Sequence, residues 1–282
     1  MKKVGVVGAG LMGAEIALCF ALSDFQVLLH DVDQNRLDTA MSRLRSLIER
    51  GISRGFFSED QLQPTLARFS LTTDLHSFSE VEMVTEAVFE EQGIKADLLG
   101  KLDAICRPDC LIATNTSTIP ISTLAAALSP QRRTHFVGTH YFSPVSRMKL
   151  VEVIAGFDTS EAVFARAAEI MKAIGKTPIR VKDVAGFAVN RMLHMFIIEA
   201  VKLVEEGVAT PEDIDTACRL GLGHPIGPFA LMDAVTSSLC VQAQEIMQEA
   251  YGERFRPPPL LKQRVRAGYG GGKGRPGWIP HV

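Results

Sequence analysis

The chain has 282 residues, of which 46% are hydrophobic and 22% charged, and its formal net charge is −2 at pH 7. This length suits one large or two modest domains, and the composition is that of a folded globular protein rather than a disordered chain. The nearly neutral charge gives no electrostatic basis for binding nucleic acid or an anionic membrane, so we expect neither partner.

The apolar segments and the cysteines are typical of a cytoplasmic protein. No uninterrupted apolar stretch approaches membrane-spanning length, and the first apolar residues belong to a predicted strand, so we expect no signal peptide. Of the five scattered cysteines only Cys106 and Cys110 are close together, and no histidine or second cysteine pair joins them. We therefore expect reduced thiols and no metal site.

The first elements carry the fingerprint of a dinucleotide-binding site. An apolar run from Val4 leads into Gly8-Ala-Gly-Leu-Met-Gly13 and a helical pattern, and a second apolar run then ends at Asp31. The first glycine takes the tight turn, the second lets the backbone approach a pyrophosphate, and the third lets the helix pack on the strand. The helix N-terminus favours binding of phosphate. The carboxylate of Asp31 can accept hydrogen bonds from ribose hydroxyls and would repel a 2′-phosphate.

We therefore predict NAD rather than NADP as the cofactor, although Arg36 nearby argues the other way. The residues of this fingerprint that we expect to bind it are Gly8, Gly10, Leu11, Met12, Gly13 and Asp31.

The next elements form a predicted helical insertion. Apolar residues recur at helical spacing from Gln34 to about Arg50, Gly51 interrupts the pattern, and Ser58 begins a second helix as its N-cap. A plain nucleotide-binding fold would run directly to its next strand. The insertion forms either a solvated polar face or a docking surface for an anionic arm of a substrate, and its arginines are Arg43, Arg45, Arg50 and Arg54.

Strands then alternate with helices. The predicted strands are 69–72, 82–88, 111–115, 136–140, 148–154 and 178–182, and the predicted helices are 93–104, 119–128 and 160–174. This alternation indicates an α/β domain of Rossmann type, with a mostly parallel sheet and helices on both faces.

After Asp183 the strand patterns stop. Helical patterns cover 190–206, 210–220 and 232–251, with Thr210 as an N-cap and Pro211 at the first helical position. We predict a dinucleotide-binding domain over 1–184 and an all-α domain over 185–282. The glycine-rich tail from Pro257 should be mobile unless a ligand or partner orders it.

A nicotinamide-dependent enzyme that oxidises an alcohol needs a base for the hydroxyl proton, and histidine suits this role. His140 closes a predicted strand, at the end where open α/β sheets place their ligands. Glu152 lies inside an apolar run, where a carboxylate is costly unless it is paired. If 136–140 and 148–154 pair as a hairpin, Glu152 falls beside His140 and can stabilise its protonated form. This favours a catalytic histidine over a structural one.

Two further polar positions are candidates for ligand contact. Asn115-Thr-Ser117 follows a predicted strand on the ligand side of the sheet, where it can contact nicotinamide or a substrate oxygen, cap the next helix, or do both. Asn190 opens the first helix of the second domain, from which it can reach a ligand or simply lie at the surface.

Together these motifs resemble the L-3-hydroxyacyl-CoA dehydrogenase family, including its 3-hydroxybutyryl-CoA dehydrogenases. The matching segments run in family order and cover most of the chain: 8–13, 86–90, 115–117, 140–145, 148–152, 186–191 and 221–229. The glycine fingerprint is shared by many families, whereas the block from His140 to Glu152 together with Asn190 is far more specific.

The resemblance implies reversible, NAD-dependent oxidation of an L-3-hydroxyacyl-CoA to the 3-oxoacyl-CoA. It implies His140 as general acid/base, Glu152 as its partner, and Ser117 and Asn190 as the residues that hold the 3-oxygen of the acyl chain. The further residues that it places in the NAD site are Asp31, Ala87, Val88, Glu90, Lys95 and Asn115. It also implies an acyl-CoA substrate whose coenzyme A arm meets Arg50, Ser53 and Arg54, and a homodimer formed through the helical domain.

Two departures and two alternatives accompany this resemblance. Ser143 stands where family members often have Asn, and the segment 272–278 lacks the Phe-Tyr pair usual after Gly-Lys-Gly. One alternative is a same-fold dehydrogenase of a free hydroxy acid or polyol, such as carnitine or gulonate, although those relatives usually carry His-Pro where this chain has His140-Tyr. The other is a catalytically inactive NAD-binding protein, against which His140 and Glu152 both argue.

Overall fold

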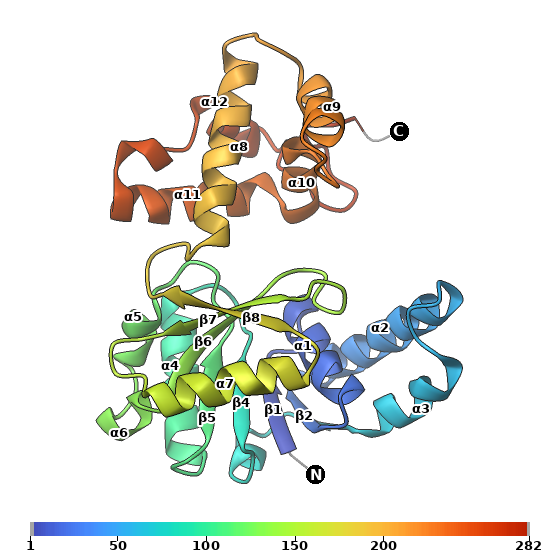
Figure 1. Ribbon diagram of the computed structural model, residues 1–282, viewed down its shortest axis with the longest axis vertical. Coiled ribbons are helices and arrows are strands. Elements are labelled where there is room, and N and C mark those ends of the chain that lie inside the picture. Colours follow the sequence, from blue (N-terminus) through green and yellow to red (C-terminus); the bar gives the residue numbers. More distant parts are fainter. Residues whose placement is uncertain (1–2, 281–282) are drawn as a thin grey trace. The chain divides into compact units, whose positions relative to one another are not determined.

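The computed structural model describes residues 3–280, and the chain divides into two compact units, 1–184 and 185–282. The first unit is built of alternating strands and helices and the second of helices (Figure 1). The predicted fold class, a Rossmann-type unit with a helical insertion followed by a helical unit, is confirmed. Within the described part of the chain, no helix combines the length and apolar character that a membrane span requires.

One sheet forms the centre of the first unit, with the strand order β3-β2-β1-β4-β5-β6-β7-β8. All neighbours pair in parallel except β6 and β7, which are antiparallel. The order reverses between β1 and β4, and open sheets of this type bind ligands outside the strand ends at such a point. The strands are β1 (Lys3–Val7), β2 (Gln26–His30), β3 (Phe69–Thr72), β4 (Met83–Glu86), β5 (Leu111–Thr114), β6 (Phe136–Tyr141), β7 (Leu150–Ala155) and β8 (Thr177–Lys182).

Helices cover both faces of this sheet (Figure 1). Apolar residues of α1, α2 and α7 share one core with residues of the strands, and α1 is buried along most of its length. The helical elements are α1 (Leu11–Leu22), α2 (Gln34–Ser53), α3 (Glu59–Ala67), η1 (Leu75–Phe78), α4 (Gln92–Ile105), α5 (Ile121–Ala125), α6 (Pro130–Arg133) and α7 (Glu161–Ala173).

The insertion consists of α2 and α3, and α2 is longer than predicted. It continues through Gly51 to Ser53, and a Cβ atom at Gly51 would lie 2.2 Å from Cδ2 of Phe57. Gly51 is therefore a packing position for an aromatic ring, and the prediction that it interrupts the helix is wrong. Ser58 precedes α3 as predicted, and its backbone N–H donates to Oε1 of Gln61 at 3.0 Å.

The predicted helix over 119–128 is also wrong in its extent. Only α5 is helical there, and its first two N–H groups, of Ile121 and Ser122, donate to the carboxylate of Asp183 at 2.6 and 2.8 Å. This long-range cap defines where the helix begins, and no local pattern reveals it.

The helical unit contains α8 (Val189–Glu205), α9 (Pro211–Gly221), α10 (Pro228–Val235), α11 (Ser237–Tyr251), η2 (Glu253–Phe255) and α12 (Pro259–Arg266). Thr210 caps α9 as predicted, accepting the N–H of Asp213 at 3.1 Å. The single helix predicted over 232–251 is wrong, because Thr236 has a φ of 86° and separates α10 from α11.

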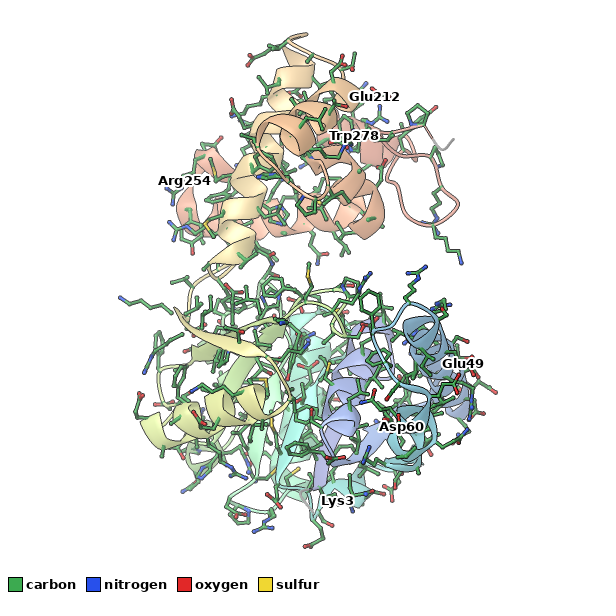
Figure 2. The ribbon with its side chains drawn as sticks, turned by 45° about the vertical axis from the view of Figure 1, so that its right-hand side comes forward. Lys3, Glu49, Asp60, Glu212, Arg254 and Trp278 are labelled. Carbon is green, nitrogen blue, oxygen red and sulfur yellow. The ribbon has the colours of Figure 1, made fainter. Side chains whose placement is uncertain are left out.

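The glycine-rich tail, which we predicted to be mobile unless a ligand or partner orders it, packs against the helical unit over its described residues. The carboxylate of Asp233 accepts the backbone N–H groups of Trp278 and Ile279, both at 2.9 Å. The indole N–H of Trp278 donates to Oγ of Ser237 at 3.0 Å, and its ring lies 4.9 Å from that of Phe229. Trp278 is buried within this unit and is labelled in Figure 2.

Candidate active site

A cavity of about 810 Å³ opens at the carboxyl ends of β1, β2 and β4, and the glycine turn forms part of its wall. Gly8 has a φ of 102°, and a Cβ atom there would lie 2.6 Å from the carbonyl oxygen of Ala87. A Cβ atom at Gly13 would lie 1.9 Å from the carbonyl oxygen of Gly8. Both positions therefore require glycine, for the turn and for the packing of helix on strand.

Gly10 differs from the other two glycines of the motif, because a Cβ atom at this position would meet nothing within 4 Å. Open space here fits a ligand that approaches the backbone. Gly10 is also the N-cap of α1, whose first turn has no acidic residue and no side-chain cap. The unsatisfied N–H groups and the partial positive charge of the helix suit a pyrophosphate.

Asp31 lines the same cavity and is held against the glycine turn. Its Oδ2 accepts the N–H of Ala9 and its Oδ1 the N–H of Val32, both at 2.9 Å. The guanidinium of Arg36 lies 3.6 Å from Oδ1. Because each carboxylate oxygen has two lone pairs, Asp31 keeps acceptor capacity for ribose hydroxyls.

The other predicted NAD residues divide into two groups. Ala87 and Val88 line the cavity, as do Leu11 and Met12. Lys95 is fully buried, 2.8 Å from Oε1 of Glu86 and 3.5 Å from Oε2 of Glu90. The predicted residues that do not line the cavity are Gly13, Glu90, Lys95 and Asn115.

Glu90 instead organises the segment that carries Ser117. Its Oε1 accepts the hydroxyl of Thr116 at 2.6 Å and the N–H groups of Ser117 and Thr118 at 2.7 and 3.0 Å. Burial raises the pKa of Glu90, but Lys95 and these donors outweigh it, and the net pKa lies below its usual range. The ionised Glu90 therefore fixes the half-buried Ser117 at the end of β5.

Asn115 connects the ends of two neighbouring strands. Its Oδ1 accepts the backbone N–H of Tyr141 at 3.0 Å, which joins the end of β5 to the end of β6. Asn115 and Ser117 thereby stand at the same edge of the sheet as the final residues of β6.

His140 and Glu152 form a buried pair on adjacent strands. The predicted hairpin is confirmed: β6 and β7 pair antiparallel, and His140 stands opposite Glu152. Nδ1 of His140 lies 2.7 Å from Oε2 of Glu152, and the two residues are 4% and 0% exposed. An ionised carboxylate only accepts hydrogen bonds, so Nδ1 is the donor in this contact when Glu152 is ionised. The ring of Phe142 lies 4.6 Å from that of His140.

Asn190 belongs to the second unit, where it lies in the first turn of α8. Within the first unit, the structure thus brings His140 and Glu152 into direct contact and places Ser117 at the end of a nearby strand.

A second cavity, of about 430 Å³, lies between α2 and the turn that joins β6 to β7. Arg50 and Arg54 line it, whereas Ser53 does not; the hydroxyl of Ser53 donates to the carbonyl oxygen of Arg50 at 2.9 Å. Arg147 adds a third guanidinium, 4.7 Å from the ring centre of Phe56. Figure 2 marks the two helices of the insertion by Glu49 and Asp60.

Sequence reasoning missed several charged residues of these sites. Arg43, for which the sequence left open a solvated polar face or a docking surface for an anionic arm of a substrate, lines the first cavity. Glu15 and Lys176 are buried at the turn that follows β6. An acid inside the otherwise apolar α1 is a signal that could have identified Glu15, whereas Arg147 and Lys176 have no such local signal.

Comparison with known proteins places both units in one family. Residues 3–184 match the family model "3-hydroxyacyl-CoA dehydrogenase, NAD binding domain", and residues 186–280 match "3-hydroxyacyl-CoA dehydrogenase, C-terminal domain". A probable 3-hydroxybutyryl-CoA dehydrogenase of Deinococcus radiodurans is 39% identical over 280 residues, which covers 99% of this chain and 100% of that protein.

Two solved structures show the same fold over the full chain. FadB2 of M. tuberculosis has a TM-score of 0.96 at 35% identity, covering 100% of this chain and 99% of that one. The (S)-3-hydroxybutyryl-CoA dehydrogenase of Ralstonia eutropha has a TM-score of 0.93 at 35% identity, with 100% of both chains covered.

Proposed function

Since this chain belongs to the 3-hydroxyacyl-CoA dehydrogenase family and is an NAD-dependent enzyme of that family, we propose that His140 and Glu152 carry the proton transfer in the oxidation of an L-3-hydroxyacyl-CoA. The observation that supports this assignment is the buried contact of 2.7 Å between Nδ1 of His140 and Oε2 of Glu152. A histidine in this setting can accept and return a proton near neutral pH.

The proposed roles follow from the chemistry of each group. Nε2 of His140 takes the proton of the 3-hydroxyl, and Glu152 stabilises the imidazolium that forms. The turn from Gly8 to Gly13 and Asp31 would hold NAD⁺, which would supply the acceptor for the hydride that leaves C3. The hydroxyl of Ser117 and the amide of Asn190 orient the 3-oxygen, and Glu90 supports Ser117 through its backbone N–H. In the reverse direction His140 returns the proton to that oxygen.

We assign the coenzyme A arm to the second cavity. Its three guanidinium groups, of Arg50, Arg54 and Arg147, match the negative charge of the phosphates, and Arg suits this contact because it binds phosphate through two donors. Ser53 contributes by bonding to the backbone of Arg50, which lies in the last turn of α2.

The substrate and the assembly are proposed from the relatives. Several of them are named 3-hydroxybutyryl-CoA dehydrogenases, so we propose a four-carbon acyl chain. We also propose a homodimer formed through residues 185–282. Large apolar side chains that lie exposed on this unit, Met192, Leu220 and Leu222 among them, support such an interface.

One variant tests the catalytic assignment. We expect His140→Ala to lower kcat by on the order of 10²–10⁴ while the Kd for NADH is unchanged. His135→Ala is the matched control, because His135 precedes the same strand at its opposite end. Near-normal turnover of His140→Ala would refute the role of His140.

A substrate panel tests the reaction. Acetoacetyl-CoA, longer 3-oxoacyl-CoA compounds and free acetoacetate are assayed with NADH and with NADPH. We expect the highest kcat/KM with acetoacetyl-CoA and NADH. Comparable activity with free acetoacetate would favour a dehydrogenase of free hydroxy acids, and the absence of all oxidation of NADH would favour an inactive binding protein.

A further inference from the structure

Arg43 reaches from the insertion to the glycine turn. It lies on α2, and its Nη2 donates to the carbonyl oxygen of Gly10 at 2.8 Å. Arg43 and Gly10 both line the cavity of about 810 Å³. A long side chain from the third turn of α2 therefore ends at the backbone that a dinucleotide must approach.

The charge of Arg43 is not balanced by the protein. Three cationic side chains line this cavity, and two of them are paired: Arg36 lies 3.6 Å from Asp31, and Lys101 lies 2.7 Å from Asp97. Among residues 3–280 no carboxylate lies within ion-pair distance of Arg43, and its buried Nε has no hydrogen-bond partner. A buried donor without a partner costs free energy.

The N-terminus of α1 adds positive potential at the same place. Gly10 is its cap residue, its first turn has no acidic side chain, and the space beside Gly10 is open. A guanidinium and a helix N-terminus repel each other unless an anion lies near both. The arrangement is therefore complementary to a negatively charged ligand group beside Gly10.

We infer that Arg43 binds the pyrophosphate of NAD from the α2 side, opposite the N–H groups of α1. A guanidinium offers several donors in a planar fork, which matches two phosphate oxygens. The 2′-phosphate of NADP is the other anion that could approach this cavity. Its ribose would lie at Asp31, where Arg36 is the adjacent cation, whereas Arg43 contacts Gly10.

The test compares Arg43→Met with Arg45→Met. Arg45 lies two residues away on α2, is exposed, and lines neither cavity. The Kd values of NADH and NADPH are measured by nucleotide fluorescence and that of ADP by calorimetry, without acyl-CoA. We expect Arg43→Met to raise the Kd of all three ligands by a similar factor, about tenfold, and Arg45→Met to leave them unchanged.

Two further measurements distinguish direct contact of Arg43 with the phosphates from an indirect effect in which Arg43 only stabilises the glycine turn. Raising the ionic strength should narrow the difference in Kd between the wild-type protein and Arg43→Met, because salt screens the attraction between a guanidinium and a phosphate. Arg43→Lys, which keeps the charge, should recover part of the affinity. The inference would be overturned by a loss of affinity confined to NADPH, by an unchanged Kd for ADP, or by a difference in Kd that does not depend on salt. His140 takes no part in these titrations, so they stand apart from the test of catalysis.

Discussion

Nζ of Lys176 lies 2.8 Å from the carbonyl oxygen of Met148, and it also donates to the carbonyl oxygen of Val145. From α1, Oε2 of Glu15 accepts the N–H and the hydroxyl of Ser146 at 3.1 and 3.2 Å. The buried side chains of Glu15 and Lys176 thus hold the turn between β6 and β7, the strands that carry His140 and Glu152. The same turn lines the cavity that we assign to coenzyme A.

We predict that Lys176→Met raises the KM for acyl-CoA and leaves the Kd for NADH unchanged, since only the second cavity is bordered by this turn. Loss of two charge-assisted hydrogen bonds should also lower the free energy of unfolding by about 2 kcal/mol or more. Steady-state kinetics and urea unfolding measure both effects. Lys172→Met, which removes an exposed ion pair with Glu169, is the control. An unchanged KM would contradict the positioning role of Lys176.

For Glu152→Gln we expect kcat to fall by on the order of 10²–10⁴, because the amide keeps the size of the side chain but does not stabilise an imidazolium. Stopped-flow measurement of NADH oxidation with saturating substrate gives the rate. Glu161→Gln, an exposed residue of α7 paired with Arg180, serves as the control. A rate equal to that of wild type would show that Glu152 has only a structural role.

The packed tail gives a prediction about stability. Asp233→Ala leaves the N–H groups of Trp278 and Ile279 without their acceptor, which should destabilise the helical unit by about 1–3 kcal/mol for each group that stays buried. Trp278 is the single tryptophan of the chain, so its emission should shift to longer wavelength as the ring becomes exposed. The control is Glu249→Ala on the exposed side of α11. An unshifted emission in Asp233→Ala would contradict the role of Asp233 in holding the tail.

The buried imidazole of His194 should make the free energy of unfolding depend on pH. Burial lowers its pKa to about 4, whereas an unfolded histidine titrates near 6.5. Above pH 6.5 both states are neutral, and its contribution to stability is fully present. As the pH falls from 6.5 to about 4, only the unfolded state gains the proton, and the free energy of unfolding drops by up to about 3 kcal/mol.

Urea unfolding followed by Trp278 fluorescence between pH 4 and 7.5 measures this slope for the helical unit. His194→Gln should flatten it, while His224→Gln, at an exposed position of the same unit, should not. The same slope in His194→Gln as in wild type would show that other groups account for the acid sensitivity.

The sequence predicted features that depend on local spacing. The glycine turn, the alternation of strands and helices, and the hairpin with His140 opposite Glu152 all follow from patterns within short segments. The hairpin could be predicted because a carboxylate in an apolar strand needs a nearby partner.

The features that were missed depend on contacts between distant segments. Phe57 packs over Gly51, and the backbone of the tail donates to Asp233. Arg43 is likewise explained only by its contact with Gly10. Such partners are defined by the fold, so single-residue patterns cannot reveal them.

The pairing of β6 with β7 has a consequence for folding fidelity as well as for chemistry. A slip of one residue would set His140 opposite Val151 or Val153 and would turn the side chain of Glu152 away from it. The buried carboxylate would then lose its imidazole contact, which penalises the misaligned hairpin. The contact between His140 and Glu152 thus favours the correct strand register, and a hairpin in that register has also assembled the pair that we propose for proton transfer.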